Sequence, residues 1–264
     1  MQTTAAGPLR LTRHGHVLEV VLDRPPANAI DVATSQAMGE CFAGFRDDPE
    51  LRVAIISSGS PKFFSAGWDL KEAAQGSPPD ADYGVGGFGG LQQLPGLNKP
   101  VIAAVNGIAV GGGFELALSA DLIIAAGDAR FALPEIRAGT LADAATIKLP
   151  RRIPHHVAID LLLTGRWMEA QEAQRWGLLK EIVPVNQLMA RARELAEVLA
   201  QGPPLVFAAI KEVMRQTESM PEMEAITRVA KRQFPTVDRL YSSEDQIEGA
   251  RAFVEKRPPL WKGR

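Results

Sequence analysis

Three short runs in the first half of the chain are apolar without the alternation of a half-exposed strand. They lie at residues 53–57, 101–105 and 122–126. Strands that are apolar on both faces are typical of a parallel sheet covered on both sides. A fourth β-rich run, at residues 18–22, ends in the turn DRPP at 23–26. We therefore predict a buried, largely parallel sheet.

Helical patterns alternate with these strands. Asp31 is placed to cap an amphipathic helix that carries Met38, Cys41, Phe42 and Phe45 and ends near residues 47–49 (DDP). Strand, helix and strand alternate up to about residue 135, which indicates α/β architecture.

From about residue 143 the pattern is helical. We predict helices near residues 155–164, 186–201, 204–218, 221–234 and 243–256. The chain then divides into an α/β core, residues 1–200, and a helical C-terminal region, residues 201–264. Apolar positions in the last helices suit either internal packing or a subunit interface. Residues 76–90 (GSPPDADYGVGGFGG) are too rich in Gly and Pro to form an element, and a loop this long is usually functional or disordered.

Composition excludes several classes of protein. The 264 residues carry 29 basic and 31 acidic side chains, a net charge of −2 that argues against a nucleic-acid partner. The most apolar stretch, 101–126, contains Asn106, Glu115 and Asp121, so we expect no membrane span. The single cysteine excludes an internal disulfide and a thiolate metal site. We expect a soluble protein of a reducing compartment, the cytoplasm.

Familiar cofactor motifs are absent or misplaced. Residues 84–89 (GVGGFG) fit the dinucleotide string G-x-G-x-x-G, but a Pro/Gly loop precedes them and no acidic residue follows before Phe114. There is no Walker A string, no G-x-S-x-G and no H-E-x-x-H. His155 and His156 are adjacent, so they point apart on a helix, and we expect no metal.

Glu115 is the most informative position. It follows Gly111–Gly113 and Phe114 inside what must be a buried helix. Burial disfavours the charged form of a carboxylate, which raises its pKa and suits it to proton transfer near neutral pH. The alternative is a structural carboxylate that binds the neighbouring turn.

Backbone corners near Glu115 add a second kind of chemistry. Unpaired N–H groups at a glycine-rich helix start can approach a ligand oxygen, as an oxyanion hole requires; a tight strand-to-helix turn is the plainer reading. Residues 63–69 (FFSAGWD) form another such corner, and Glu135, after Pro134, is a second acid in an apolar setting. Two carboxylates and two N–H corners suggest acid/base chemistry beside a stabilised enolate.

These residues resemble the crotonase (enoyl-CoA hydratase/isomerase) superfamily, over nearly the whole chain. The matching stretches are 22–31 (LDRPPANAID), 64–70 (FSAGWDL), 99–107 (KPVIAAVNG), 111–117 (GGGFELA), 131–135 (FALPE), 163–166 (LTGR), 173–178 (AQRWGL) and 252–257 (AFVEKR). The resemblance implies an α/β fold, a spiral of ββα turns with a helical C-terminal trimerisation region, and a homotrimer or a dimer of trimers.

The resemblance also implies roles for single residues. The backbone N–H groups of Trp68 and Gly112 would bind the thioester oxygen, and Glu115 and Glu135 would be the catalytic acids. Glu115 would activate water for attack at C3, and Glu135 would supply the proton at C2. Coenzyme A would enter as part of an acyl-CoA substrate, with no permanently bound cofactor. The residues placed near it by motif are Arg24, Ala27, Lys62, Ala66 and Lys256.

Within the superfamily the chain is most similar to the carnitinyl-CoA dehydratases. The stretches are 28–31 (NAID), 45–49 (FRDDP), 51–56 (LRVAII), 65–71 (SAGWDLK), 79–82 (PDAD) and 261–264 (WKGR). Their substrate carries a trimethylammonium group, which aromatic faces can hold. Trp68, Tyr83 and Phe88 are our candidates, with Asp80 or Asp82 adding charge.

One segment departs from the superfamily pattern. A Pro and a Gly pair usually follow the second glutamate, whereas residues 139–146 read GTLADAAT and are one residue shorter. This change suggests a reshaped pocket, another substrate or weaker activity. A general short-chain enoyl-CoA hydratase or isomerase, and a non-catalytic acyl-CoA-binding homologue, therefore remain as alternatives.

Overall fold

A computed structural model describes residues 2–74, 78 and 81–264. Within these residues, one sheet has seven strands in the order β1-β2-β3-β5-β8-β10-β13, and a second has four in the order β12-β11-β9-β6. β4 and β7 form a separate pair. The strands are β1 (Gln2–Ala6), β2 (Leu9–His14), β3 (Val17–Leu22), β4 (Ala29–Ile30), β5 (Val53–Ser58), β6 (Phe63–Ser65), β7 (Gly67–Trp68), β8 (Val101–Val105), β9 (Ile108–Val110), β10 (Leu122–Ala126), β11 (Arg130–Ala132), β12 (Met168–Glu169) and β13 (Glu181–Val183).

Helices follow pairs of strands. The α-helices are α1 (Val32–Asp47), α2 (Leu70–Ala74), α3 (Gly112–Ser119), α4 (Glu135–Ala138), α5 (Asp143–Lys148), α6 (His155–Thr164), α7 (Ala170–Arg175), α8 (Leu188–Ala200), α9 (Pro204–Thr217), α10 (Glu222–Ala230), α11 (Pro235–Tyr241) and α12 (Glu244–Glu255). Short 3₁₀ turns are η1 (Phe88–Gly90), η2 (Leu149–Arg151) and η3 (Val185–Gln187). None of the described helices is long and apolar enough to cross a membrane.

The repeating unit is a strand of each sheet followed by a helix. β8 lies in the large sheet, β9 in the small one, and α3 follows; β10, β11 and α4 repeat the pattern. The strands from β3 to β13 pair in parallel, with Ile56 opposite Ala103 and Ala104 opposite Ile124. The predicted spiral of ββα turns is therefore confirmed.

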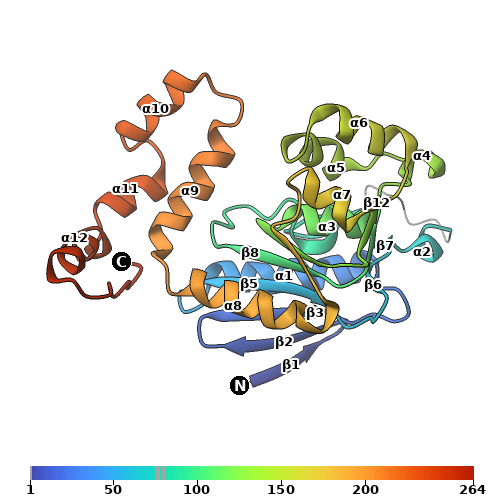
Figure 1. The fold of residues 1–264 in the computed structure, drawn as a ribbon, viewed down its shortest axis with the longest axis horizontal. Helices are drawn as coiled ribbons and strands as arrows, with labels where there is room; N and C mark the ends of the chain where they lie inside the picture. Colours follow the sequence, from blue (N-terminus) through green and yellow to red (C-terminus); the bar gives the residue numbers. More distant parts are fainter. Residues whose placement is uncertain (1, 75–77, 79–80) are drawn as a thin grey trace.

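Burial explains the apolar strands. Val53, Ile55, Ile102 and Ile124 face α8 in one core cluster. Their neighbours Ala54, Ile56, Val101 and Ala103 face the other way, into the larger cluster that includes residues of α1 and α3. Both faces of the parallel strands are covered, as predicted (Figure 1).

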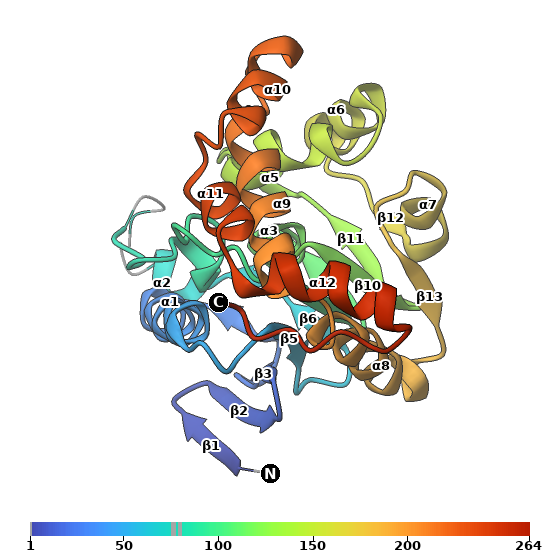
Figure 2. The ribbon, with the colours of Figure 1, turned by 90° about the vertical axis from the view of Figure 1, so that its left-hand side faces the viewer.

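The helical C-terminal region extends from one end of the core in Figure 1, and Figure 2 views the molecule from that side. The predicted boundary at residue 200 falls between α8 and α9. One helix prediction is wrong at its end: 221–234 stops at Ala230, and α11 starts a new helix at Pro235. Proline lacks the N–H that would continue a helix and disfavours helical backbone in the residue before it.

The expectation for residues 76–90 needs a smaller correction. Residues 88–90 do form an element, the 3₁₀ turn η1. A side-chain carbon on Gly90 would lie within 2.6 Å of Met38 and Gly39 atoms, so this part of the loop packs tightly on α1. Among the described residues just before GVGGFG (78 and 81–83) there is no strand, and no α-helix opens at its end, which supports rejecting the dinucleotide motif.

Candidate active site

Helix α3 carries Glu115 into the interior. The chain leaves β9 and turns at Gly111, whose φ of 57° is a left-handed conformation that glycine adopts without strain. The carbonyl of Gly111 accepts the N–H of Glu115 at 3.1 Å, which places that carboxylate in the first helical turn. Only 7% of Glu115 is exposed.

Two donors hold the Glu115 carboxylate. The backbone N–H of Ala145 donates to Oε1 at 2.9 Å, and the side-chain amide of Gln92 donates to Oε2 at 3.2 Å. Burial raises the pKa of Glu115, the two hydrogen bonds oppose that rise, and the charge of Asp143 adds to it. The predicted buried carboxylate is confirmed, and it is fixed in one orientation.

Glu135 lies in a different environment. It opens α4 directly after Pro134. Burial, helped by the negative charges of Glu115 and Asp143, raises its pKa to about 7. Its Oε2 atom is buried and has no hydrogen-bond partner among the described residues. Near neutral pH this group can therefore carry a proton that Glu115, with its two donors, holds less readily.

The two backbone corners meet beside these acids. A side-chain carbon on Gly67 would lie 2.7 Å from the nitrogen of Gly112, so β7 and the start of α3 are in direct contact. Gly112 is the first residue of α3, and its N–H lies outside the intrahelical ladder. The N–H groups of Trp68 and Gly112 therefore come from adjoining segments, as an oxyanion hole requires.

One cavity of about 640 Å³ unites the predicted catalytic and acyl-pocket residues. Its lining includes Trp68, Asp82, Tyr83, Phe88, Gly112, Glu115 and Glu135. The rings of Tyr83 and Phe88 meet edge to face, with centroids 5.3 Å apart. The alternative anionic residue, Asp80, lies outside the described residues.

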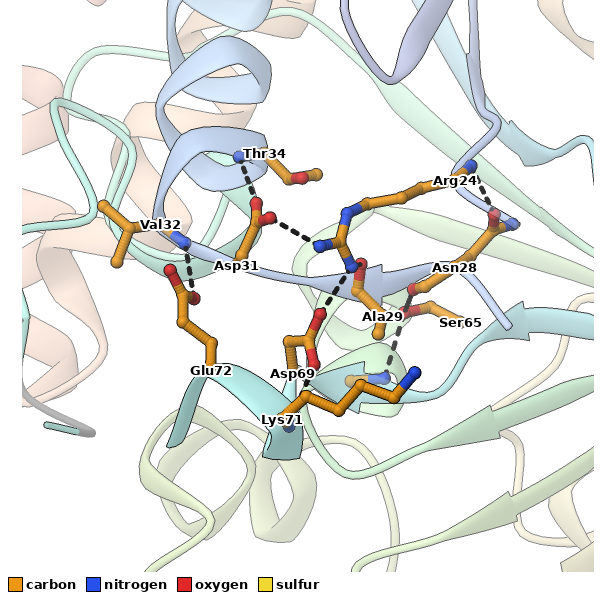
Figure 3. A network of polar contacts seen from close by, with 11 residues as sticks. Arg24, Asn28, Ala29, Asp31, Val32, Thr34, Ser65, Asp69, Lys71 and Glu72 are labelled. Atoms are coloured by element: carbon orange, nitrogen blue, oxygen red, sulfur yellow. Dashed lines mark hydrogen bonds and ion pairs between the residues drawn. The ribbon is translucent and has the colours of Figure 1, made fainter. Parts of the chain in front are cut away.

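None of the five residues predicted for coenzyme A lines this cavity. Arg24 is engaged within the chain: its guanidinium donates to Asp31 at 2.6 Å and to Asp69 at 2.7 Å (Figure 3). These contacts join the loop after β3 to the segment after β7.

The other four are placed as follows. The N–H of Ala66 donates to the carbonyl of Ala27 at 2.9 Å, so these two residues adjoin. The ammonium of Lys62 lies 5.5 Å from the centre of the Phe63 ring. Lys256 directly follows α12 in the C-terminal region. Their roles toward a nucleotide stay predictions.

The atypical segment 139–146 forms part of the site. Thr140, Leu141, Asp143 and Ala144 line the cavity. The segment still forms a helix, α5, whose Ala145 N–H reaches Glu115. Side chains therefore lie at the cavity wall where the superfamily usually has a glycine pair. Glu115 nevertheless keeps its hydrogen bond from the backbone of Ala145.

Sequence reasoning missed Gln92 and Lys148, which also line the cavity. Lys148 is partly buried and donates to the carbonyl of Gln92 at 3.2 Å and to Ser119 Oγ at 2.8 Å. Burial lowers its pKa to about 8. Nothing in the local sequence marks either residue, because both meet Glu115 only through the tertiary fold. Within the described residues, no group of three potential metal ligands gathers.

Comparison with known proteins agrees with this geometry. The sequence profile of the family described as enoyl-CoA hydratase/isomerase matches residues 12–264. Carnitinyl-CoA dehydratase of Citrobacter koseri is 55% identical over 260 residues, which cover 97% of this chain and 98% of that protein. The protein of the same name from Salmonella typhi is 54% identical over 257 residues, with the same coverage. The crystal structure of enoyl-CoA hydratase from Mycobacterium tuberculosis H37Rv matches with a TM-score of 0.88 at 33% identity, covering 98% of this chain and 100% of that one. The chain belongs to the enoyl-CoA hydratase/isomerase family.

Proposed function

We propose that this protein is a hydro-lyase that interconverts carnitinyl-CoA and crotonobetainyl-CoA by reversible loss and addition of water. The observation that carries the proposal is the pair of dissimilar glutamates, Glu115 and Glu135, on one cavity beside the Trp68 and Gly112 corners. The choice of acyl group is supported by the relatives of that name, at 54–55% identity over 97% of the chain.

The two acids divide the proton transfers. In hydration, Glu115 removes a proton from water while the water oxygen bonds to C3 of the enoyl thioester. The C2–C3 π electrons move onto the thioester oxygen as an enolate, which the N–H groups of Trp68 and Gly112 stabilise. Glu135 then donates its proton to C2. Dehydration runs the same transfers in reverse.

The raised pKa of Glu135 supports this division. A group with a pKa of about 7 is about half protonated at neutral pH and can act as the acid. Glu115 is better suited to be the base, because Ala145 and Gln92 donate hydrogen bonds to its ionised form. Coenzyme A enters as part of the substrate, and these steps need no resident cofactor.

We propose that the rings of Trp68, Tyr83 and Phe88 hold the trimethylammonium group of the substrate. Each ring face contributes about 0.5–2 kcal/mol to binding a cation. Alanine variants of Trp68, Tyr83 and Phe88 should lose selectivity for crotonobetainyl-CoA over crotonyl-CoA. If none of the three loses it, the aromatic assignment is wrong.

The proposed function is tested by following loss of enoyl-thioester absorbance with crotonobetainyl-CoA and with crotonyl-CoA. Faster turnover of the first, and near-complete loss of activity in Glu115→Gln and Glu135→Gln, are the expected results. Faster turnover of crotonyl-CoA would favour a general enoyl-CoA hydratase. Binding of both thioesters without turnover would favour a non-catalytic homologue, for which Glu115→Gln leaves affinity nearly unchanged.

We also propose a homotrimer or a dimer of trimers, assembled through the C-terminal helices and acting in the cytoplasm. Large apolar side chains are exposed on α9, α10 and α12: Ile210, Met214, Met223, Ile226, Phe253 and Val254. Such a surface is usual at a protein interface. Light scattering after gel filtration tests the assembly, and a monomer at micromolar concentration would contradict it.

A further inference from the structure

The arrangement around Gln92 points to a function for a residue outside the motifs of the site. Gln92 lies 23 positions before Glu115 and just after the glycine-rich loop, and its amide nitrogen is 3.2 Å from Glu115 Oε2. Among the described residues, it is the only one whose side chain donates a hydrogen bond to that carboxylate.

Gln92 is itself held in place. Lys148 Nζ donates to the backbone carbonyl of Gln92 and also to Ser119 Oγ, and Ser119 Oγ donates to the carbonyl of Glu115 at 2.8 Å. Lys148 thus connects the segment of Gln92 to the helix of Glu115. Two segments that lie far apart in the sequence are joined by one partly buried cation.

We propose that Gln92 is a positioning residue for Glu115, anchored by Lys148, and that it keeps this carboxylate ionised and oriented toward the water. Ala145 fixes one carboxylate oxygen and Gln92 the other, so rotation of the carboxylate is restricted. The inference rests on the proposed function only in assigning Glu115 as the base.

The charged groups around Glu115 set the direction of the effect. The negative charge of Asp143 opposes the ionisation of Glu115, while Glu135 is neutral when it holds the proton that it donates in hydration. Lys148 is a cation whose charge interacts with that of Glu115, and the charge of Arg152 in turn acts on Lys148. With the anion Asp143 near, the hydrogen bond donated by Gln92 helps the Ala145 N–H to stabilise the ionised form.

The test compares variants of similar size at position 92. Gln92→Met removes the donor, and Gln92→Glu replaces it with a group that can carry negative charge. We expect the acidic limb of the hydration profile of kcat/KM to move to higher pH by about one unit in Gln92→Met, about 1.4 kcal/mol. It should move further in Gln92→Glu. The effect on KM should be less than threefold.

The matched control is Gln93→Met, at the next position. Gln93 also borders the cavity, but its side chain donates no hydrogen bond to a carboxylate among the described residues. The acidic limb of the kcat/KM profile of Gln93→Met should stay at the wild-type pH, even if KM changes. A purely structural role for Gln92 predicts equal profiles for the wild type, Gln92→Met and Gln92→Glu, and that result would overturn the proposal.

Anchoring by Lys148 is tested separately. Lys148→Met should shift the acidic limb in the same direction, and the double variant with Gln92→Met should shift it by less than the sum, since both changes act through one contact. Additive shifts would remove Lys148 from the proposal.

A readout without turnover separates this proposal from the proposed function. The carboxylate band of Glu115 is isolated as the infrared difference between the protein and Glu115→Gln, and it is followed against pH with and without Gln92→Met. Absence of turnover with any enoyl-CoA contradicts the proposed function, whereas an unshifted band contradicts the role of Gln92.

Discussion

Gly67 offers a sharp test of the proposed oxyanion hole. Its φ of 77° is left-handed, and a side-chain carbon there would lie 2.7 Å from both the nitrogen of Gly112 and the carbonyl oxygen of Val110. Ordinary contact begins at 3.4 Å. In Gly67→Ala, β7 and the start of α3 must therefore separate by about 0.7 Å, because the obstructing atoms belong to the backbone.

This separation would move apart the N–H groups of Trp68 and Gly112, the two proposed donors of the oxyanion hole. A misplacement approaching 1 Å can cost about 100-fold in rate, which corresponds to about 2.7 kcal/mol in the activation barrier. We expect kcat for hydration to fall about 100-fold in Gly67→Ala, with a smaller change in KM. Left-handed backbone should also cost an alanine about 1–2 kcal/mol of stability.

The assay is the loss of enoyl-thioester absorbance, with thermal unfolding measured on the same samples. Gly44→Ala is the control: Gly44 lies in α1 with no atom within 4 Å of the added carbon, and the change should stabilise the chain by about 0.5–1 kcal/mol. A folded Gly67→Ala protein with kcat within threefold of the wild type would refute the reasoning.

Further predictions follow from the same site and from the C-terminal region. In Gly112→Ala the added carbon would meet the Phe88 ring at 2.4 Å, a side chain that can move, so KM should rise more than kcat falls in steady-state assays. Because Glu135 must be protonated for hydration and its pKa is about 7, the hydration rate should fall as pH rises above 7; a rate independent of pH from 6 to 9 would contradict this. The raised pKa means that the folded chain keeps a proton which the unfolded chain releases, so stability is lost as pH rises from about 4.5 to 7. Glu135→Gln should accordingly raise the melting temperature at pH 8 and leave it unchanged at pH 4. Asp245 is 2% exposed and accepts two backbone N–H groups of the C-terminal tail, so Asp245→Ala should cost about 2–4 kcal/mol in urea unfolding, and a loss below 1 kcal/mol would argue against this.

The sequence predicted the parts of the fold that local burial determines. The strands at residues 53–57, 101–105 and 122–126 are apolar on both faces because helices cover both sides of the sheet. The hairpin of β1 and β2 was missed, since its polar residues resemble a loop until Leu9 pairs with Leu22 of β3. Edge strands of this kind are defined by a neighbour more than by their own pattern.

The same distinction applies to the site. Glu115 and Glu135 were visible as acids in apolar surroundings, and Gly111–Gly113 as a glycine-rich helix start. Gln92 and Lys148 carried no such signal, because a polar residue beside a glycine-rich loop or in a short amphipathic helix is ordinarily solvated. Only the packing of α5 and of the segment after η1 against α3 makes them neighbours of Glu115.

The atypical segment shows why part of the site tolerates sequence change. Ala145 binds Glu115 through its backbone N–H, so any residue other than proline can supply that bond if α5 keeps its position. Gly67 and Gly113 differ, because a side-chain carbon at either would lie within 2.7 Å of backbone atoms. We therefore expect a substitution to have a small effect on activity at a position that contributes only a backbone N–H. The effect should be large at a position where two backbone segments are in direct contact. Thus Ala145→Ser should retain hydration activity within tenfold, whereas Gly113→Ala should abolish it, and comparable rates for the two variants would contradict this view of the site.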